Sequence, residues 1–538
     1  MGLNKTLTKL SRHLAVNRSV VAGSWQLKRF SSDSKGKRPP IVCNFNQPPL
    51  SESLPDLPKA VYSKAKLEEN LTFVTKLHNG IRVATEDHFG QFCTVGVMID
   101  CGSRYEVAYP SGVSHFLEKL AFNSTVNYES KDAILKELEK YGGICDCRSS
   151  RDAFMYAASA LREGLDPVMK VIADAVLRPK ITHEELTEAQ ETVRYELESL
   201  HSKPDQDLIL MDLIHAAAYR DNTLGLPKLC PEKNLLIIDR ETIFTFLKNY
   251  YDPSRIVVTG VGVNHDDLVN AVKKYFIDAR PVWETDSSIK VNADRRYAPD
   301  RSVAQYTGGL IQQKCEIPAF VGPSGLPELA HVVIGLEGTS FTDDDFIPLC
   351  VLNMMMGGGG SFSAGGPGKG MFTRLYLNVL NKHHWIFSAT AFNHSYIDTG
   401  LFCIHVSATP EHVGKMTEVI VKEMVNMAGS VHPEELWRAK KQLQSLLLMN
   451  LEAKPVVFED IARQVLAHGF RKKPEAFINL ISRVEEEDIQ RVARRILSTP
   501  PAVAARGDIS KLPSYGSIQG GLMGLQTAPT NKRLSLFH

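Results

Sequence analysis

The feature that most constrains the fold of this chain is a pattern that occurs twice along it. One helical stretch opens with His-Glu-Glu-Leu at residue 183, and another opens with Pro-Glu-Glu-Leu at residue 433. A helix-like segment, a turn containing proline, a strand-like segment and a glycine then follow at 239–260, and again at 485–507. Both repeats are offset by about 250 residues, which indicates an internal duplication. Since 538 residues are too many for one hydrophobic core, we expect more than one domain.

The elements within each copy predict the fold class. Residues 94–99 and 331–336 have the composition of strands, and they lie among amphipathic helical stretches. We therefore predict an α+β fold. Changes in composition divide the chain into an N-terminal leader 1–32, an extended lead-in 33–70, a first domain 71–283, a linker 284–325, a second domain 326–514 and a polar tail 515–538.

The leader has the pattern of a mitochondrial transit peptide. Leu3, Leu7, Leu10 and Leu14 recur at helical spacing, and basic side chains fall on the other side of the same helix. The leader contains six basic residues and no acidic one, and it lacks the unbroken apolar core of a secretory signal. The alternative is a basic arm that belongs to the fold. We expect a transit peptide that is cleaved near residue 32.

The charge of the remaining chain limits its partners. Six of the 62 basic residues lie in the leader, so 56 remain against 61 acidic residues. A mildly acidic body argues against binding to nucleic acid and suits a basic ligand. No run of eighteen apolar residues is present that would span a bilayer. The nine cysteines, including the close pair Cys145 and Cys147, are interpreted as reduced thiols, because no second pair is spaced to complete a metal site.

A sequence close to a zinc-binding motif lies at residues 115–119. His115, Glu118 and Lys119 occupy positions i, i+3 and i+4 of a helical stretch, so they share one face. In the inverted zinc motif H-x-x-E-H, the two histidines bind the metal and the glutamate is the general base. A lysine at the second ligand position is an ammonium without a lone pair, and it repels a dication. We therefore predict no catalytic residue and no metal ligand in this motif.

The surroundings of the motif resemble a known family. The stretches 102–106 (Gly-Ser-Arg-Tyr-Glu) and 115–122 are similar to the inverzincin, or pitrilysin, family of zinc peptidases, and the similarity extends over most of 70–515. The third ligand of that family is a glutamate, and its position, with 76 residues between it and Lys119, is Glu196. The resemblance implies a frame that has lost one ligand. It also implies two homologous domains, each a mainly antiparallel sheet with helices packed on it, forming a clam around a central cavity.

A stretch rich in glycine at 357–370 is the second candidate site. Eight of its fourteen residues are glycine, but it lacks the spacing of a P-loop or of G-x-G-x-x-G, so nucleotide binding is disfavoured. Such a stretch is able to approach a peptide backbone closely, and the alternative is a long surface loop without function. The family resemblance implies that it binds substrate. The implied substrate-binding residues are Gly357, Gly358, Gly359, Gly360, Ser361, Phe362, Gly365, Gly366, Pro367, Gly368, Lys369 and Gly370.

The resemblance also implies a function that is divided between two subunits. This chain would be the non-catalytic, substrate-binding subunit of a heterodimeric mitochondrial protease that cleaves presequences from imported precursors. Presequences are basic and amphipathic, which suits an acidic binding surface. This chain would hold no cofactor, because zinc and catalysis would belong to a catalytic beta subunit with the full H-x-x-E-H motif. The location would be the mitochondrial matrix, with association with the inner membrane left open.

Two other functions remain open. The first is an active zinc endopeptidase with a substituted ligand, against which Lys119 argues. The second is a core structural subunit of the respiratory bc1 complex, whose related chains also have degraded zinc sites. The glycine-rich stretch favours the processing function. A weaker candidate for contact with a basic presequence is Asp343-Asp344-Asp345, whose alternative is a turn or a helix N-cap.

Overall fold

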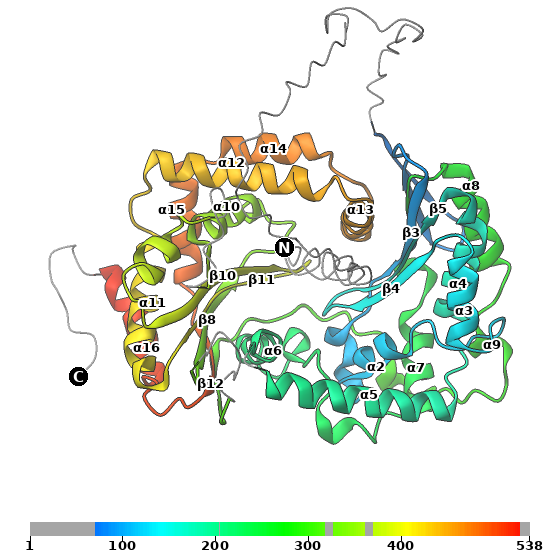
Figure 1. Ribbon diagram of the computed structural model, residues 1–538, viewed down its shortest axis with the longest axis horizontal. Helices are drawn as coiled ribbons and strands as arrows, with labels where there is room; N and C mark the ends of the chain where they lie inside the picture. Colours follow the sequence, from blue (N-terminus) through cyan, green and yellow to red (C-terminus); the bar gives the residue numbers. More distant parts are fainter. Residues whose placement is uncertain (1–69, 204, 318–326, 361–369, 528–538) are drawn as a thin grey trace, which may run out of the picture. The chain divides into compact units, whose positions relative to one another are not determined.

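The computed structural model describes residues 70–203, 205–317, 327–360 and 370–527 (Figure 1). The predicted transit peptide, the lead-in up to residue 69 and part of the predicted linker lie outside these ranges. Two large hydrophobic cores are present in the described chain, one in each half. In these ranges no helix combines the length and the apolar character that crossing a membrane requires.

A six-stranded sheet organises the first half, in the order β1-β2-β6-β3-β5-β4. Neighbouring strands are antiparallel except for β2 and β6, which are parallel. Helix α4 packs on β3 and β5 and shares the core with them. The strands are β1 (Thr72–Lys76), β2 (Arg82–Glu86), β3 (Phe92–Ile99), β4 (Ile144–Ser149), β5 (Phe154–Leu161) and β6 (Ile256–Val261). The α-helices are α2 (Val113–Leu120), α3 (Lys131–Glu139), α4 (Leu165–Leu177), α5 (His183–Ser202), α6 (Asp207–Ala218), α7 (Arg240–Tyr250), α8 (His265–Val272) and α9 (Val282–Thr285).

A second six-stranded sheet organises the other half, in the order β7-β12-β8-β11-β10-β9. Neighbouring strands of this sheet are antiparallel except for β7 and β12, which are parallel. The strands are β7 (Gly309–Lys314), β8 (Ala330–Gly338), β9 (Gly358–Gly360), β10 (Ile386–Ser395), β11 (Gly400–Ala408) and β12 (Ala502–Gly507). The helices are α10 (Phe346–Met356), the π-helix η8 (Leu375–Leu380), α11 (Val413–Asn426), α12 (Pro433–Asn450), α13 (Lys454–His468), α14 (Pro474–Arg483), α15 (Glu486–Leu497) and α16 (Tyr515–Thr527).

The two sheets share one topology. Five neighbouring strands of the first sheet, β2-β6-β3-β5-β4, correspond in chain order and direction to β7-β12-β8-β11-β10 of the second. In the first half α2 follows β3 and packs against α5, and in the second half α10 follows β8 and packs against α12. The predicted two-domain α+β fold with mainly antiparallel sheets is confirmed, and the matching topology supports the internal duplication. The central cavity stays a prediction.

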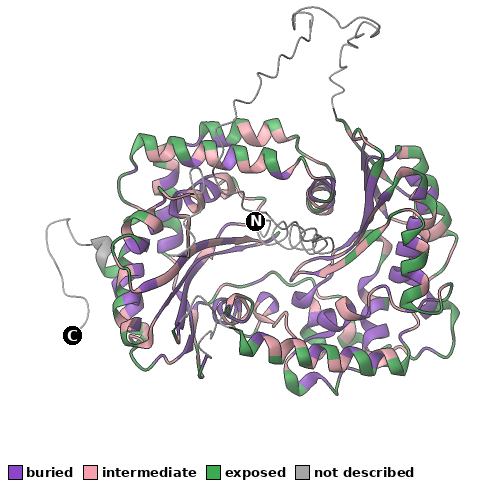
Figure 2. Ribbon diagram, viewed as in Figure 1, coloured by how far each residue is buried: buried purple, intermediate pink, exposed green. Residues whose placement is uncertain are grey.

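Each half also covers one face of the other half's sheet. Leu210 and Ile214 of α6, from the first half, pack on buried residues of β8, β11 and β12. Phe458 and Ile461 of α13, from the second half, pack on Ala84 of β2 and on β6. Both faces of the central strands are therefore covered, and β6, β11 and β12 are buried along their whole length (Figure 2).

Two of the predicted segments differ from the structure. The predicted linker 284–325 contains β7, which pairs with β12 as a strand of the second sheet. Its alternating pattern is weak because β7 lies at the edge of that sheet. The polar tail predicted from residue 515 begins instead with helix α16, whose Ile518 and Leu522 are buried in the second core. Glycine and polar residues between these two side chains hide the apolar face in the sequence. The remaining boundaries stay predictions.

Candidate functional site

A buried carboxylate positions helix α2, which carries the zinc-like motif. Gly112 precedes the helix with a φ of 111°, a conformation that favours glycine. Glu106 accepts hydrogen bonds from the backbone N–H groups of Gly112 (2.7 Å) and Ser114 (2.6 Å). It thereby satisfies donors that have no partner within the helix. Burial raises the pKa of Glu106 to about 7, although these hydrogen bonds act in the opposite direction. Glu106 matches no ligand spacing, so its role is visible only in the folded chain.

The motif face of α2 meets Glu196 of α5. His115 Nδ1 accepts a hydrogen bond from the backbone N–H of Cys230 (3.2 Å), so His115 Nε2 carries the ring proton and donates it to Glu196 Oε2 (3.2 Å). Lys119 Nζ lies 2.6 Å from the same carboxylate oxygen. The hydrogen bond from His115 lowers the pKa of Glu196 to about 2, and Lys119 acts in the same direction against partial burial. The structure thus joins three of the four predicted frame residues in one hydrogen-bonded cluster.

Glu118, the fourth residue of the frame, is held by β4 rather than by the cluster. Its Oε2 accepts hydrogen bonds from the backbone N–H (3.0 Å) and the hydroxyl (2.6 Å) of Ser149, while its Oε1 lies 3.9 Å from Lys119 Nζ. Burial alone would raise the pKa of Glu118, but the charge of Lys228 and the bonds from Ser149 outweigh it, so this pKa is lowered. Glu118 is consequently an ionised carboxylate with a fixed orientation.

The residues of this cluster do not fit a zinc ion. Zinc requires lone pairs from imidazole or carboxylate groups at about 2.0–2.2 Å. His115 Nε2 already donates a hydrogen bond to Glu196, and Lys119 places a cation against the same carboxylate, where a second imidazole would be needed. Across the described ranges, no group of three or more His, Cys, Asp and Glu side chains is arranged to hold a metal. The cluster is therefore an ion pair within a ligand frame.

Glu196 is brought to this position by a well-defined helix start. Thr182 and Glu185 form a capping box at the N-terminus of α5, with each side chain accepting a hydrogen bond from the other residue's backbone N–H. Glu185 also accepts a hydrogen bond from the backbone N–H of Ser124 (2.8 Å), which lies just after α2. This carboxylate therefore ties the two helices that carry the frame.

The glycine-rich stretch begins where α10 ends. Gly357 has a φ of 55°, and the short strand β9 that follows pairs with β10. Gly370 resumes the described chain and has a φ of 84°. The π-helix η8 (Leu375–Leu380) follows shortly after Gly370. The predicted substrate-binding residues that lie outside the described ranges are Ser361, Phe362, Gly365, Gly366, Pro367, Gly368 and Lys369.

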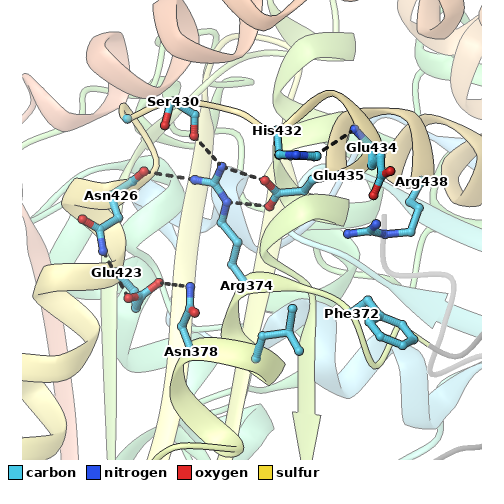
Figure 3. A pocket seen from close by; sticks show the side chains of 12 residues that line it. Phe372, Arg374, Asn378, Glu423, Asn426, Ser430, His432, Glu434, Glu435 and Arg438 are labelled. Carbon is cyan, nitrogen blue, oxygen red and sulfur yellow. Dashed lines mark hydrogen bonds and ion pairs between the residues drawn. The ribbon is translucent and has the colours of Figure 1, made fainter.

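A polar pocket of about 470 Å³ lies beside the far end of this stretch, between η8, α11 and α12 (Figure 3). Arg374 Nε and Nη2 bind the carboxylate of Glu435 at 2.6 and 3.0 Å. On the opposite wall, Glu423 accepts hydrogen bonds from the side-chain amides of Asn378 and Asn426, both at 3.1 Å. Arg374, Glu435 and Glu423 are therefore already engaged by partners within the protein.

The acidic run at 343–345 is occupied in a similar way. Asp343 forms an ion pair with Arg495 (2.8 Å), and Asp345 forms ion pairs with Arg491 (2.7 Å) and Arg495 (3.0 Å) of α15. Asp345 is also the N-cap residue of α10. The interpretation as a turn and helix start therefore describes this run better than a free acidic patch.

Comparison with known proteins covers both halves of the chain. A family model described as insulinase (peptidase family M16) matches residues 82–232, and another, described as the peptidase M16 inactive domain, matches residues 238–443. The chain belongs to peptidase family M16. The resemblance found around residues 102–122 is thereby confirmed.

Curated M16 relatives are similar along almost their whole length. The mitochondrial-processing peptidase subunit alpha of Bos taurus is 53% identical over 497 residues, covering 92% of this chain and 91% of the relative. The human protein of that name is 52% identical over 509 residues, covering 93% and 94%. The protein of that name from Solanum tuberosum is 32% identical over 521 residues, covering 96% and 95%. This M16 chain is thus similar to alpha subunits of both animals and plants.

Proposed function

We propose that this chain is the non-catalytic, substrate-binding subunit of a heterodimeric mitochondrial processing protease. The observation that carries the proposal is the ion pair of Lys119 with Glu196, 2.6 Å long, within a frame that keeps His115 and Glu118. Because an ammonium cannot ligate zinc, this frame cannot activate a water molecule in the way that a zinc peptidase requires. Similarity to proteins named mitochondrial-processing peptidase subunit alpha supports the proposal.

The glycine-rich stretch 357–370 is the proposed substrate-binding element of the chain. It follows α10, whose place in the second half corresponds to that of α2 in the first half. Helices α2 and α10 thus occupy equivalent positions in the duplicated fold. Helix α2 carries the zinc-like motif, whereas the glycine-rich stretch follows α10. The proposed substrates are basic amphipathic presequences. Residues 33–538 contain more acidic than basic side chains, which suits a basic ligand.

Catalysis belongs to the partner in this proposal. The proposed partner is a catalytic beta subunit whose intact H-x-x-E-H motif would hold a zinc ion, and that ion would supply the Lewis-acid chemistry of peptide hydrolysis. The proposed location is the mitochondrial matrix, which the name of the relatives and the basic leader support. This chain binds and orients the presequence, and no step of the chemistry is assigned to its own residues.

Two measurements on purified proteins test the proposal: zinc content by metal analysis and cleavage of a fluorogenic presequence peptide. We expect less than about a tenth of an equivalent of zinc in this chain, because a site with one imidazole and an ammonium does not retain the metal. We expect no cleavage by this chain or by the partner alone, and cleavage when the two are mixed.

Each alternative function predicts a different result in these measurements. Nearly stoichiometric zinc together with cleavage by the chain alone would identify it as an active peptidase. No cleavage in the mixture, together with co-purification with cytochromes, would identify it as a structural subunit of the respiratory chain. A matched control is the mixture in which the glutamate of the partner's motif is replaced by glutamine, which is expected to bind peptide without cleaving it.

A further inference from the structure

Three buried histidines lie where helix α6 contacts the second sheet. His331 of β8 and His405 of β11 lie near the start of α6, and His215 belongs to α6 itself. Their exposed fractions are 4%, 5% and 2%. None of them belongs to the zinc-like motif or to the glycine-rich stretch. Since α6 comes from the first half, these imidazoles are part of the contact between the two halves.

A row of hydrogen-bonding groups joins the start of α6 to the second sheet. His405 Nδ1 lies 3.2 Å from Oδ1 of Asp207, the first residue of α6, so this nitrogen carries the ring proton. His405 Nε2 is then an acceptor, and it receives a hydrogen bond from His331 Nδ1 (3.1 Å). His331 Nε2 is buried and has no hydrogen-bond partner in the described part of the chain. In this arrangement both imidazoles are neutral.

A positive charge already lies beside this row. Arg506 of β12 is opposite His331 in the pairing of β12 with β8, and it is 3% exposed. Burial, together with His405 and Arg506, lowers the pKa of His331 to about 3, while Asp207 acts in the opposite direction. The side chains that accept hydrogen bonds from the Arg506 guanidinium are His201, Gln206 and Gln313. A proton on His331 would therefore add a second buried cation next to Arg506.

The third histidine holds the middle of α6. His215 Nδ1 donates to the backbone carbonyl one turn earlier (2.6 Å), and its Nε2 accepts a hydrogen bond from the hydroxyl of Tyr396, which follows β10 (2.8 Å). Burial lowers the pKa of His215 well below its usual value, and Arg151 and His394 act in the same direction. Arg151 is itself paired with Asp212 of α6 (2.5 Å). The neutral imidazole is thus the form that this contact requires.

We infer that α6 forms an acid-sensitive contact between the two halves, which neutral imidazoles hold at the start and in the middle of the helix and which their protonation releases. A histidine whose pKa is lower in the folded chain stabilises the fold fully above its unfolded value of 6.5. For His331 that contribution is lost as the pH falls from 6.5 towards about 3. The inference goes beyond the proposed function, because it concerns how the halves are joined and not how substrate binds.

Hydrogen exchange of the full chain at pH 7.5 and at pH 5.5 tests this contact. The rates are corrected for the intrinsic effect of pH, and the amides of α4, in the first core, are the reference. We expect the α6 amides to exchange about ten-fold faster or more at pH 5.5, relative to α4. About ten-fold is the factor that the pKa of His331 alone gives between these two pH values.

Variants assign this acceleration to the imidazoles. His331→Gln keeps a donor for His405 Nε2 and binds no proton, so we expect the acceleration to fall by about ten-fold. His384→Gln is the matched control, because His384 is an exposed residue of the same half, and it is expected to keep the full acceleration. Circular dichroism at pH 7.5 confirms that each variant is folded. If His331→Gln does not fold, His215→Gln replaces it, because its amide oxygen still accepts from Tyr396, and we expect less acceleration than in the wild type.

Three results would overturn the inference. The first is an equal acceleration of α6 and α4 in the wild type, since acid would then loosen the whole chain and not this contact. The second is an acceleration in the folded glutamine variant of His331 or His215 that is as large as in the wild type. The third is an equal loss of acceleration in His384→Gln, which would assign the effect to the general charge of the protein.

Discussion

At the scale of single residues, Lys119 determines the chemistry of the first half. His115, Glu118 and Glu196 are all present, and the fold brings His115 and Glu196 to within 3.2 Å of each other. The lysine nitrogen has the charge of a cation and no lone pair, so it binds the carboxylate that would otherwise face a metal. One substitution thus converts a ligand frame into an ion pair and leaves its surroundings in place.

Restoring an imidazole at this position is expected to restore zinc binding. In Lys119→His the ammonium is removed and the frame has two imidazoles and Glu196, so we expect about one equivalent of zinc per chain by metal analysis. Lys119→Gln is the matched control, because it removes the charge without supplying a ligand, and it is expected to stay free of zinc. Zinc-free protein in both variants would show that the geometry of the frame, and not only Lys119, prevents binding.

At the scale of elements, α6 and α13 each pack on the sheet of the opposite half. Both segments have apolar residues along them, but nothing in the helical pattern specifies which sheet they cover. The ring of Phe458 on α13 is 1% exposed and fits against β3, where a Cβ on Gly96 would lie 2.7 Å from Cζ of Phe458. Gly96 and Phe458 are thus a complementary pair from distant parts of the chain.

Removing this ring is expected to destabilise the protein. Phe458→Ala leaves a cavity under the first sheet, so we expect the free energy of unfolding in urea to fall by about 3–5 kcal/mol. Met449→Ala, an exposed change at the end of α12, is the control and is expected to shift the free energy of unfolding by less than about 0.5 kcal/mol. Equal and small effects in the two variants would mean that α13 contributes little to holding the halves together.

At the scale of the whole described chain, the exchange of helices couples the two halves. Arg104 of the first half binds Asp398 of the second through two contacts of 3.0 and 2.5 Å, and Glu86 is paired with Arg471. Unfolding one half would expose the apolar surface of the sheet in the other half, because α6 or α13 would leave it. The halves are therefore duplicated in sequence but not independent in stability.

We expect both halves to unfold together. Calorimetry of the full chain should show one main transition, with agreement between calorimetric and van't Hoff enthalpies. Two separated transitions in the wild-type protein would contradict this coupling. In Phe458→Ala the single transition is expected to move to lower temperature without splitting, provided that α6 still covers the second sheet.

Local patterns in the sequence determine much of this molecule. The acidic openings at residues 183 and 433 predict the starts of helices α5 and α12, and the chemistry of the Lys119 side chain by itself excludes a zinc ligand at that position. The repeated order of elements predicts the duplication. These properties depend on residues that are close together in the chain, so they follow without any knowledge of long-range contacts.

Contacts between distant residues decide the rest. An edge strand and a glycine-rich helix have weak patterns of apolar residues. Strand β7 is therefore recognised only from its pairing with β12, and helix α16 only from its packing in the second core. The role of Glu106 at α2 depends on backbone groups that only the folded chain brings together. Complementary shape likewise decides which sheet α6 and α13 cover. Apolar burial is non-directional, and the spacing of apolar residues in a helix does not specify the surface on which the helix packs.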